Sequence, residues 1–316
     1  MMSGCIILAP INHTANLLSV NERSCDIGFV MKRRTAIALA MVAGLAAIVS
    51  ITIYAVDEPV HRWGQFYLWK VFSGKAHGGQ HIRVDDASIY CETFGAGPPV
   101  LVLHDGVGYT EDMSFQIRAL AKSHFVIAVD SRGHGRSTGA NRPLSYSLMS
   151  DDMVKVLDSL KINRVDVVGW SDGGIIGLDL AMRYPERIRR LVAISANYNP
   201  DGLGYTPSVG EVPHIALRYR LIAPDPAQWP ALYRNVVTMW RTQPQYTLTD
   251  LSHIKAPTLI MAGENDLIKR EHTDQLAKAI PGSQECIIAG ATHSVPIEKP
   301  EIIDSKILNF LDAPSY

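Results

Sequence analysis

The chain has 316 residues, of which 47% are hydrophobic and 19% charged, and its formal net charge is −1. This length and apolar content are enough to bury one large domain, and the near-zero charge provides no basic surface for nucleic acid. The sequence contains no CxxC, no HExxH and no His-rich tract. It therefore predicts neither a metal site nor a cofactor.

The N-terminal part of the chain differs in composition from the rest. Met31 begins a basic cluster, KRR, which the uncharged and mostly apolar residues 35–56 follow. This pattern is typical of an export signal, and the apolar run is close to the roughly 20 residues that span a bilayer as a helix. We expect residues 31–56 to be a signal peptide or an N-terminal membrane anchor. The protein should then be bacterial and either exported to the periplasm or anchored in the inner membrane, rather than cytoplasmic. We interpret residues 1–30 as a non-native extension upstream of Met31.

The remaining residues, 57–316, alternate predicted strands with predicted helices after a β-hairpin at 81–94. Apolar and β-branched runs predict strands at 100–104, 125–129, 165–168, 191–195, 258–262 and 285–289. Helical spacing of apolar residues predicts helices near 115–120, 149–160, 175–182, 271–280 and 300–311. This order predicts an α/β domain with a mainly parallel twisted sheet and helices on both faces.

Residues 164–184, RVDVVGWSDGGIIGLDLAMRY, predict a strand, a very tight turn and a helix. Gly169 and Gly173 lack the Cβ atoms that would collide where the strand and the helix approach closely. The turn exposes the Ser171 hydroxyl in a G-x-S-x-G pattern, at a helix N-terminus that favours an anionic intermediate. These features indicate a nucleophile rather than a serine in an ordinary glycine-rich turn.

Residues 197–251 break the alternation of strands and helices. They contain many prolines and aromatic residues and are too long for a simple connection. We interpret them as a small, mainly helical cap inserted over the active site. Most of the aromatic residues should form the core of the cap, and a few should face the substrate.

A serine hydroxyl needs a neighbouring base, and that base needs an orienting carboxylate. Asp266 and His293 each lie just beyond a predicted strand, and the carboxyl ends of parallel strands meet at one edge of a sheet. We therefore expect both residues to converge on Ser171. Glu264 is the rival acid, but it almost directly follows its strand and should point away.

The oxyanion of the tetrahedral intermediate needs two N–H donors. We expect one from the backbone of Asp172 and the other from Gly106, with Val107 as the second choice. The residues expected to contact the substrate are Asp172, Trp170, Asp105, Trp229 and Trp240.

Residues 81–312 resemble the α/β-hydrolase family. Residues 130–137, DSRGHGRS, match the family's D-x-R-G-x-G-x-S loop, and the order Ser171, Asp266, His293 is the order expected of its catalytic residues. Residues 104–106, HDG, resemble the family's His-Gly-x oxyanion loop with Asp in place of the first Gly. The resemblance implies an α/β-hydrolase fold, and the serine nucleophile separates this chain from haloalkane dehalogenases and epoxide hydrolases.

Two narrower resemblances concern the substrate. Residues 169–174, GWSDGG, are similar to the elbow of valacyclovir hydrolase, where the acid after the nucleophile holds a substrate amino group. This resemblance implies that Asp172 binds a cation, and the alternative is a carboxylate that stabilises a helix N-terminus. The whole chain is similar to the integron-cassette serine esterases that are related to macrolide esterases, which open the lactone of antibiotics such as tylosin. An anionic Asp172 under an aromatic cap suits the tertiary amine that macrolides carry.

Three functions follow as hypotheses. The favoured one is a serine carboxylester and lactone hydrolase that opens large-ring macrolides and so confers resistance. The second is an amino-acid ester hydrolase acting on small esters. The third is a hydrolase-fold binding protein without turnover, which the intact Ser, Asp and His set argues against. The expected partner is a small-molecule ester or lactone, with membrane contact only through the N-terminal segment.

Overall fold

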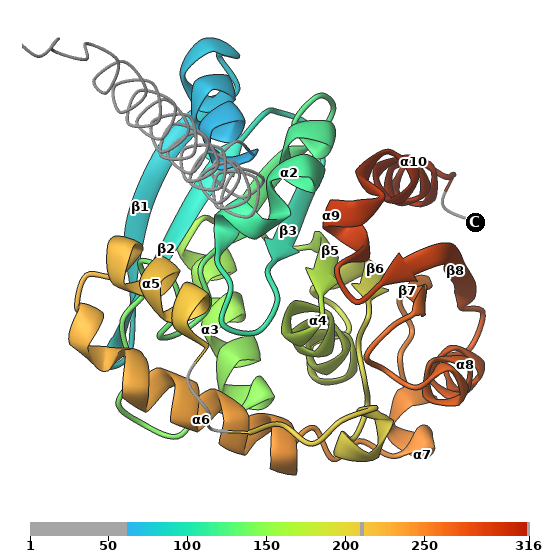
Figure 1. The fold of residues 1–316 in the computed structure, drawn as a ribbon. Helices are drawn as coiled ribbons and strands as arrows, with labels where there is room; N and C mark the ends of the chain where they lie inside the picture. Colours follow the sequence, from blue (N-terminus) through green and yellow to red (C-terminus); the bar gives the residue numbers. More distant parts are fainter. Residues whose placement is uncertain (1–61, 209–211, 315–316) are drawn as a thin grey trace, which may run out of the picture. The chain divides into compact units, whose positions relative to one another are not determined.

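An eight-stranded sheet forms the centre of the protein in a computed structural model, which describes residues 62–208 and 212–314 (Figure 1). The strands are β1 (Ala76–Val84), β2 (Ala87–Phe94), β3 (Pro99–Leu103), β4 (Phe125–Val129), β5 (Val165–Trp170), β6 (Ile188–Ile194), β7 (Thr258–Asn265) and β8 (Gln284–Thr292). Their order across the sheet is β1-β2-β4-β3-β5-β6-β7-β8. The pairs β1–β2 and β2–β4 are antiparallel, and the five later pairs are parallel.

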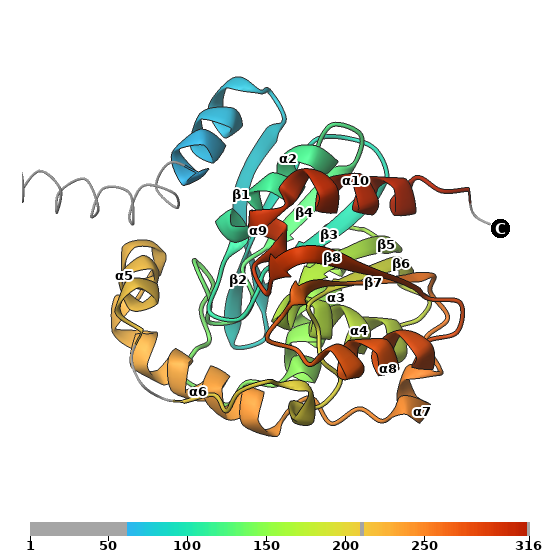
Figure 2. The ribbon, with the colours of Figure 1, turned by 45° about the vertical axis from the view of Figure 1, so that its right-hand side comes forward.

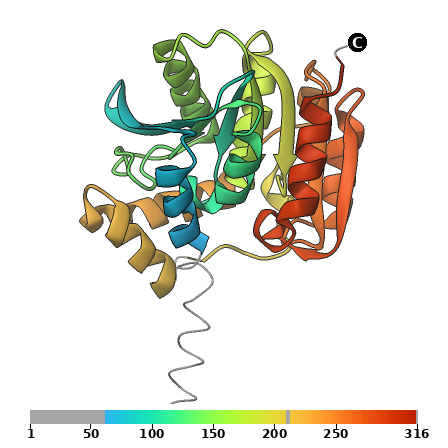
Figure 3. The same cartoon turned by 90° about the horizontal axis from the view of Figure 1, so that it is seen from above.

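Helices cover both faces of the sheet (Figures 2 and 3). They are η1 (Thr110–Met113), α2 (Ser114–Leu120), α3 (Tyr146–Ser159), α4 (Asp172–Arg183), α8 (Arg270–Ala279), α9 (Val295–Glu298) and α10 (Pro300–Leu311). Alternate residues of a strand point to opposite faces: Val100 and Val102 belong to the apolar cluster that includes α2 and α10, whereas Leu101 and Leu103 belong to the cluster that includes α3, α4 and α8. The predicted α/β-hydrolase fold, with its mainly parallel sheet and helices on both faces, is thus confirmed.

The segment between β6 and β7 is helical. It forms η2 (Pro200–Gly202), α5 (Pro213–Ile222), η3 (Pro226–Gln228), α6 (Trp229–Thr242) and α7 (Leu248–Leu251). Leu232, Val236 and Met239 of α6 are buried in the cluster that also contains α3 and α4. Asn235 Nδ2 donates to the carbonyls of Ala140 and Arg142, at 2.8 and 2.9 Å. These contacts attach α6 to the sheet-bearing part of the domain.

Strands β7 and β8 run to Asn265 and Thr292, beyond the ends predicted at 262 and 289. In the sequence, residues 263–265 (GEN) and 290–292 (GAT) indicate turns because each tripeptide begins with glycine. A Cβ at Gly263 would lie 2.3 Å from the Thr292 carbonyl oxygen, so glycine allows the two strands to stay close here. As a result Asp266 and His293 directly follow the strand ends.

The chain divides into two units, Met1–Arg62 and Trp63–Tyr316. A helix at 62–72, almost all of which belongs to the second unit, was not predicted from the sequence. In the described part of the chain, no helix is long and apolar enough to cross a membrane. The predictions for residues 1–30 and 31–56 lie outside the described residues.

Candidate active site

Ser171 lies in a tight turn between β5 and α4. Its backbone has φ 53° and ψ −115°, a conformation that costs free energy for a residue with a side chain. A Cβ at Gly169 would lie 2.1 Å from the Gly173 carbonyl oxygen, and a Cβ at Gly173 would lie 2.5 Å from the Leu103 carbonyl oxygen. Only glycine fits at both positions, so this sequence can hold the strained turn that exposes the hydroxyl.

The ends of three strands bring Ser171, His293 and Asp266 together. His293 Nε2 lies 3.0 Å from Ser171 Oγ, and His293 Nδ1 lies 2.7 Å from Asp266 Oδ1. Glu264, the rival acid, instead accepts a hydrogen bond from the backbone N–H of Gly290. The structure therefore places Asp266, not Glu264, beside His293. A serine, a histidine and a carboxylate in this arrangement can activate the hydroxyl as a nucleophile.

Several donors hold the Asp266 carboxylate. Ser195 Oγ donates to Oδ2 at 2.6 Å, and the backbone N–H of Ile268 donates to Oδ1 at 3.1 Å. Burial alone would raise the pKa of Asp266, but the hydrogen bonds from His293 and Ser195 outweigh it and lower the pKa. Ser195 was not predicted from the sequence, although its position at the end of β6, next to β7, could have indicated it.

The loop after β3 lies against the nucleophile turn. Gly173 N–H donates to the His104 carbonyl at 3.1 Å, and a Cβ at Gly106 would lie 2.7 Å from Asp172 Oδ2. Within the described part of the chain, the backbone N–H groups of Gly106, Val107 and Asp172 make no hydrogen bond. These three groups are therefore available as donors to an oxyanion.

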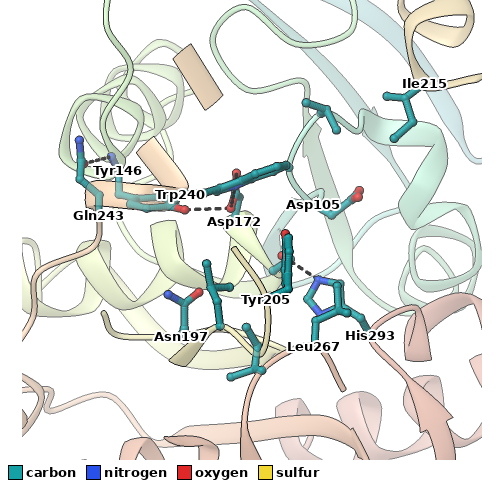
Figure 4. Close-up of a pocket in the computed structure, with 15 residues that line it drawn as sticks. Asp105, Tyr146, Asp172, Asn197, Tyr205, Ile215, Trp240, Gln243, Leu267 and His293 are labelled. Atoms are coloured by element: carbon teal, nitrogen blue, oxygen red, sulfur yellow. Dashed lines mark hydrogen bonds between the residues drawn. The ribbon is translucent and has the colours of Figure 1, made fainter. Parts of the chain in front are cut away.

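The Asp172 carboxylate is buried and hydrogen-bonded on both oxygens. Tyr146 OH donates to Oδ1 at 2.9 Å, and Trp240 Nε1 lies 2.9 Å from Oδ1 and 3.0 Å from Oδ2 (Figure 4). Burial raises the pKa of Asp172 to about 6, although these two hydrogen bonds and the nearby His293 oppose the effect. Tyr146, the first residue of α3, was not predicted from the sequence as part of the site.

A cavity of about 170 Å³ opens beside Ser171 and His293. The predicted residues Asp105, Gly106, Val107, Asp172 and Trp240 line it. The other lining residues, which were not predicted from the sequence, are Tyr146, Asn197, Leu203, Tyr205, Ile215, Gln243, Leu267 and Ile268. Five of these eight residues lie between β6 and β7, so this segment forms much of the wall.

Two predicted substrate contacts, Trp170 and Trp229, need correction because neither side chain lines the cavity. Trp170 is 4% exposed, packs in the core and donates its indole N–H to the His293 carbonyl at 2.9 Å. Trp229 is 2% exposed and packs on Tyr219 and Tyr233, with ring centroids 5.4 and 5.2 Å away. Both indoles stabilise the fold instead of facing a ligand.

Known proteins are similar to this chain in fold and in sequence. Residues 100–303 match the model of the "Alpha/beta hydrolase family". The chain is 30% identical over 265 residues to the "Putative carbamate hydrolase RutD" of Azorhizobium caulinodans, covering 74% of this chain and 97% of that protein. Est816, described as an N-acyl homoserine lactone degrading enzyme, aligns with a TM-score of 0.61 and 28% identity over 73% of this chain and all of that one. The enol-lactonase of Burkholderia xenovorans LB400 has the same fold, with a TM-score of 0.63 and 20% identity over 74% of this chain and all of that one. The chain therefore belongs to the alpha/beta hydrolase family, and hydrolysis is its general class of reaction.

Proposed function

We propose that this protein is a serine hydrolase of carboxylic esters and lactones. The observation that carries this proposal is the continuous hydrogen-bonded path from Ser171 Oγ through His293 to Asp266, with distances of 3.0 and 2.7 Å. The path ends at a cavity in which the N–H groups of Gly106, Val107 and Asp172 are available. A nucleophile, a base, an orienting acid and oxyanion donors are the parts that acyl transfer requires.

In the proposed acylation step, Ser171 Oγ forms a bond to the carbonyl carbon while His293 Nε2 takes the hydroxyl proton. The carbonyl oxygen becomes an oxyanion near the N–H of Asp172 and that of Gly106 or Val107. Collapse of this intermediate breaks the bond between the carbonyl carbon and the alkoxy oxygen, and His293 gives its proton to that oxygen. Asp266 stabilises the imidazolium that forms between these two transfers.

In the proposed deacylation step, His293 removes a proton from water, whose oxygen attacks the acyl carbon. The bond to Ser171 Oγ breaks, and the serine takes the proton back as the carboxylic acid leaves. With a lactone substrate, the alcohol formed in the first step stays tethered to the acyl group. Ring closure therefore competes with hydrolysis, and water must reach the site quickly.

For the substrate we propose a large-ring macrolide lactone. This proposal draws on the resemblance of the whole chain to macrolide-related esterases and on the lactone-degrading relative Est816. The cavity of about 170 Å³ is smaller than the roughly 300–1,000 Å³ of most ligand pockets. It would hold the ester bond and its neighbouring atoms, and the rest of the ring would lie along its mouth, where Tyr205 and Leu267 are 44% and 45% exposed.

The second candidate is a hydrolase of small amino-acid esters, and the small volume of the cavity favours it. A carboxylate directly after the nucleophile also suits a substrate with an amino group. A free carbamate, the substrate class in the name of the RutD relative, is anionic at neutral pH. The lining of the described cavity contains no lysine or arginine that could neutralise this charge, so we do not favour it.

Mass spectrometry of substrate mixtures tests this proposal. The full chain would be incubated with a tylosin-like macrolide and a small α-amino ester together, with Ser171→Ala as the control. Gain of one water by the macrolide, absent with Ser171→Ala, is the expected result. Cleavage of the small ester alone would replace the macrolide proposal with the second candidate. No Ser171-dependent cleavage of any ester would favour the binding protein without turnover.

We also propose that residues 31–56 direct export or anchor the protein, on the sequence pattern described above. Alkaline extraction of membranes from expressing bacteria tests this location. An anchor keeps the chain in the membrane fraction, and a cleaved signal gives a shorter soluble chain with a new N-terminus. A chain that retains residues 31–56 in the cytoplasmic fraction would contradict both.

A further inference from the structure

Two aspartates line the cavity, and they differ in their hydrogen bonding within the protein. Asp172 accepts hydrogen bonds from Tyr146 OH and from Trp240 Nε1, which occupy both of its oxygens. Tyr146 belongs to α3 and Trp240 to α6, so Asp172 joins two helices to the nucleophile turn. Its carboxylate is thus already used within the protein.

Asp105 is the other carboxylate. It follows β3 by two residues and lines the cavity. Its Oδ1 is buried and has no hydrogen-bond partner within the described part of the chain. A buried carboxyl oxygen without a partner is unfavourable, because it has lost its hydrogen bonds to water and gained none in return. In Figure 4, Asp105 lies apart from the Asp172, Trp240 and Tyr146 group, on the side of the cavity toward Ile215.

The cation near Asp105 is engaged elsewhere. Arg218 Nη2 donates to both oxygens of Asp112 at 2.6 Å, and its Nε donates to Tyr109 OH at 3.3 Å. The guanidinium also stacks on the rings of Tyr109 and Trp63, 4.9 Å from each centroid. Arg218 therefore neutralises Asp112 rather than pairing with Asp105.

Burial raises the pKa of Asp105 well above its ordinary value, and the neighbouring Asp112 and Asp172 add to this effect while Arg218 opposes it. An acid in this state favours the arrival of a positive charge, because a cation stabilises the ionised form that burial penalises. None of the residues lining the described cavity is a lysine or an arginine that could supply this charge. The missing positive charge is one that a ligand can bring.

We propose that Asp105 is the specificity residue that receives a positively charged, alkyl-substituted amine of the substrate. Val107 and Ile215 also line the cavity and supply apolar surface for the alkyl groups. Asp172, which the sequence resemblance suggested for this role, instead holds Trp240 and Tyr146 in place. This inference rests on the proposed ester hydrolysis and names a chemical feature of its substrate.

Two esters that differ only in charge test this assignment. One is the phenyl ester of 4-(trimethylammonio)butanoate, and the other is its neutral carbon isostere, the phenyl ester of 5,5-dimethylhexanoate. Because the shapes match, the ratio of their kcat/KM values reports the preference for the charge. For the wild-type full chain we expect a ratio of about ten or more in favour of the cation, since one engaged charge contributes about 1.4 kcal/mol.

The matched variants are Asp105→Asn and Asp172→Asn. We expect Asp105→Asn to lower the ratio about tenfold, and Asp105→Glu to restore part of the preference. Asp172→Asn should lower kcat/KM for both esters alike and keep the ratio within about twofold. Loss of the preference in Asp172→Asn but not in Asp105→Asn would overturn the assignment.

The wild-type measurement keeps the inference testable even if a variant does not fold. If the wild type hydrolyses both esters at equal efficiency, Asp105 does not receive a cation, and the proposed ester hydrolysis stands. If the wild type hydrolyses neither ester, nor any other, the proposed function itself fails. Hydrolysis that persists in Ser171→Ala would show that a different residue performs the reaction.

Discussion

Trp240, near the end of α6, donates its indole N–H to the carboxylate of Asp172, the residue directly after Ser171. A Cβ at Gly106 would lie 2.5 Å from the Trp240 ring and 2.7 Å from Asp172 Oδ2, so the loop after β3 closes against both. One contact thus links the segment between β6 and β7 to the nucleophile turn and to the loop that holds available N–H donors. The position of α6 and the geometry of the proposed oxyanion site therefore depend on each other.

Substitution Trp240→Phe tests this link. It keeps an aromatic ring and removes the N–H that Asp172 accepts. A hydrogen bond to a charged group contributes about 1.5–3 kcal/mol, so we expect kcat/KM for esters to fall about tenfold. The control is Trp229→Phe in the same helix, which lies away from the cavity and should change the Tm while kcat/KM stays within about twofold. Equal effects of the two substitutions on kcat/KM would show that α6 acts only through general stability.

Ser195 should position Asp266 through its hydroxyl. Ser195→Ala removes the 2.6 Å hydrogen bond to Asp266 Oδ2, so the pKa of Asp266 should rise. We expect kcat to fall about tenfold and the acid limb of the kcat against pH profile to move to higher pH.

Ser195→Gly separates the hydroxyl from the backbone at this position. Ser195 has φ 53°, a conformation that glycine adopts without strain. The glycine variant should have the same kcat as Ser195→Ala. Its free energy of unfolding should be about 1 kcal/mol higher than that of Ser195→Ala, because glycine removes the backbone strain. Wild-type kcat in Ser195→Gly would mean that backbone strain, not the hydroxyl, matters for the reaction.

The Asp172 carboxylate should make the stability of the fold depend on pH. Its pKa is about 6 in the folded protein and 3.8 as an ordinary carboxyl, so the folded state holds the proton more tightly than the unfolded state. The cost of ionising it is therefore absent below about pH 4 and complete above about pH 6, and it reaches roughly 3 kcal/mol.

Asp172→Asn removes this titration. Relative to Asp172→Asn, the free energy of unfolding of the wild type should fall as the pH rises from 4 to 7. Denaturant titrations at several pH values measure this difference, and other titrating groups cancel because both proteins contain them. A difference that is constant with pH would show that Asp172 is not a titrating buried carboxylate.

The sequence could predict the residues at strand ends but not the details around them. Ser171, Asp266 and His293 could be predicted because each follows an apolar run, and the carboxyl ends of parallel strands lie at one edge of the sheet. The exact strand ends could not be predicted, since Gly263 and Gly290 indicate turns in the sequence although β7 and β8 continue past them.

The residues that surround the cavity were harder to predict. Trp170 could have been excluded from it, because successive residues of a strand point to opposite faces and its side chain belongs to the core cluster with α2 and α10. Trp229 and Trp240 lie three turns apart in α6, about 16 Å along the helix. Only the position of α6 on the domain, which local sequence does not specify, decides which of them reaches the cavity.

Intact-protein mass spectrometry after exposure to a fluorophosphonate, which reacts with an activated serine, shows whether Ser171 is the nucleophile. Ser171 Oγ, 3.0 Å from His293 Nε2, should acquire a single phosphonyl group. Peptide mapping should locate it at Ser171, Ser171→Ala should stay unlabelled, and His293→Ala should react far more slowly. A wild-type protein that stays unlabelled, or one labelled equally in Ser171→Ala, would mean that Ser171 is not the activated nucleophile.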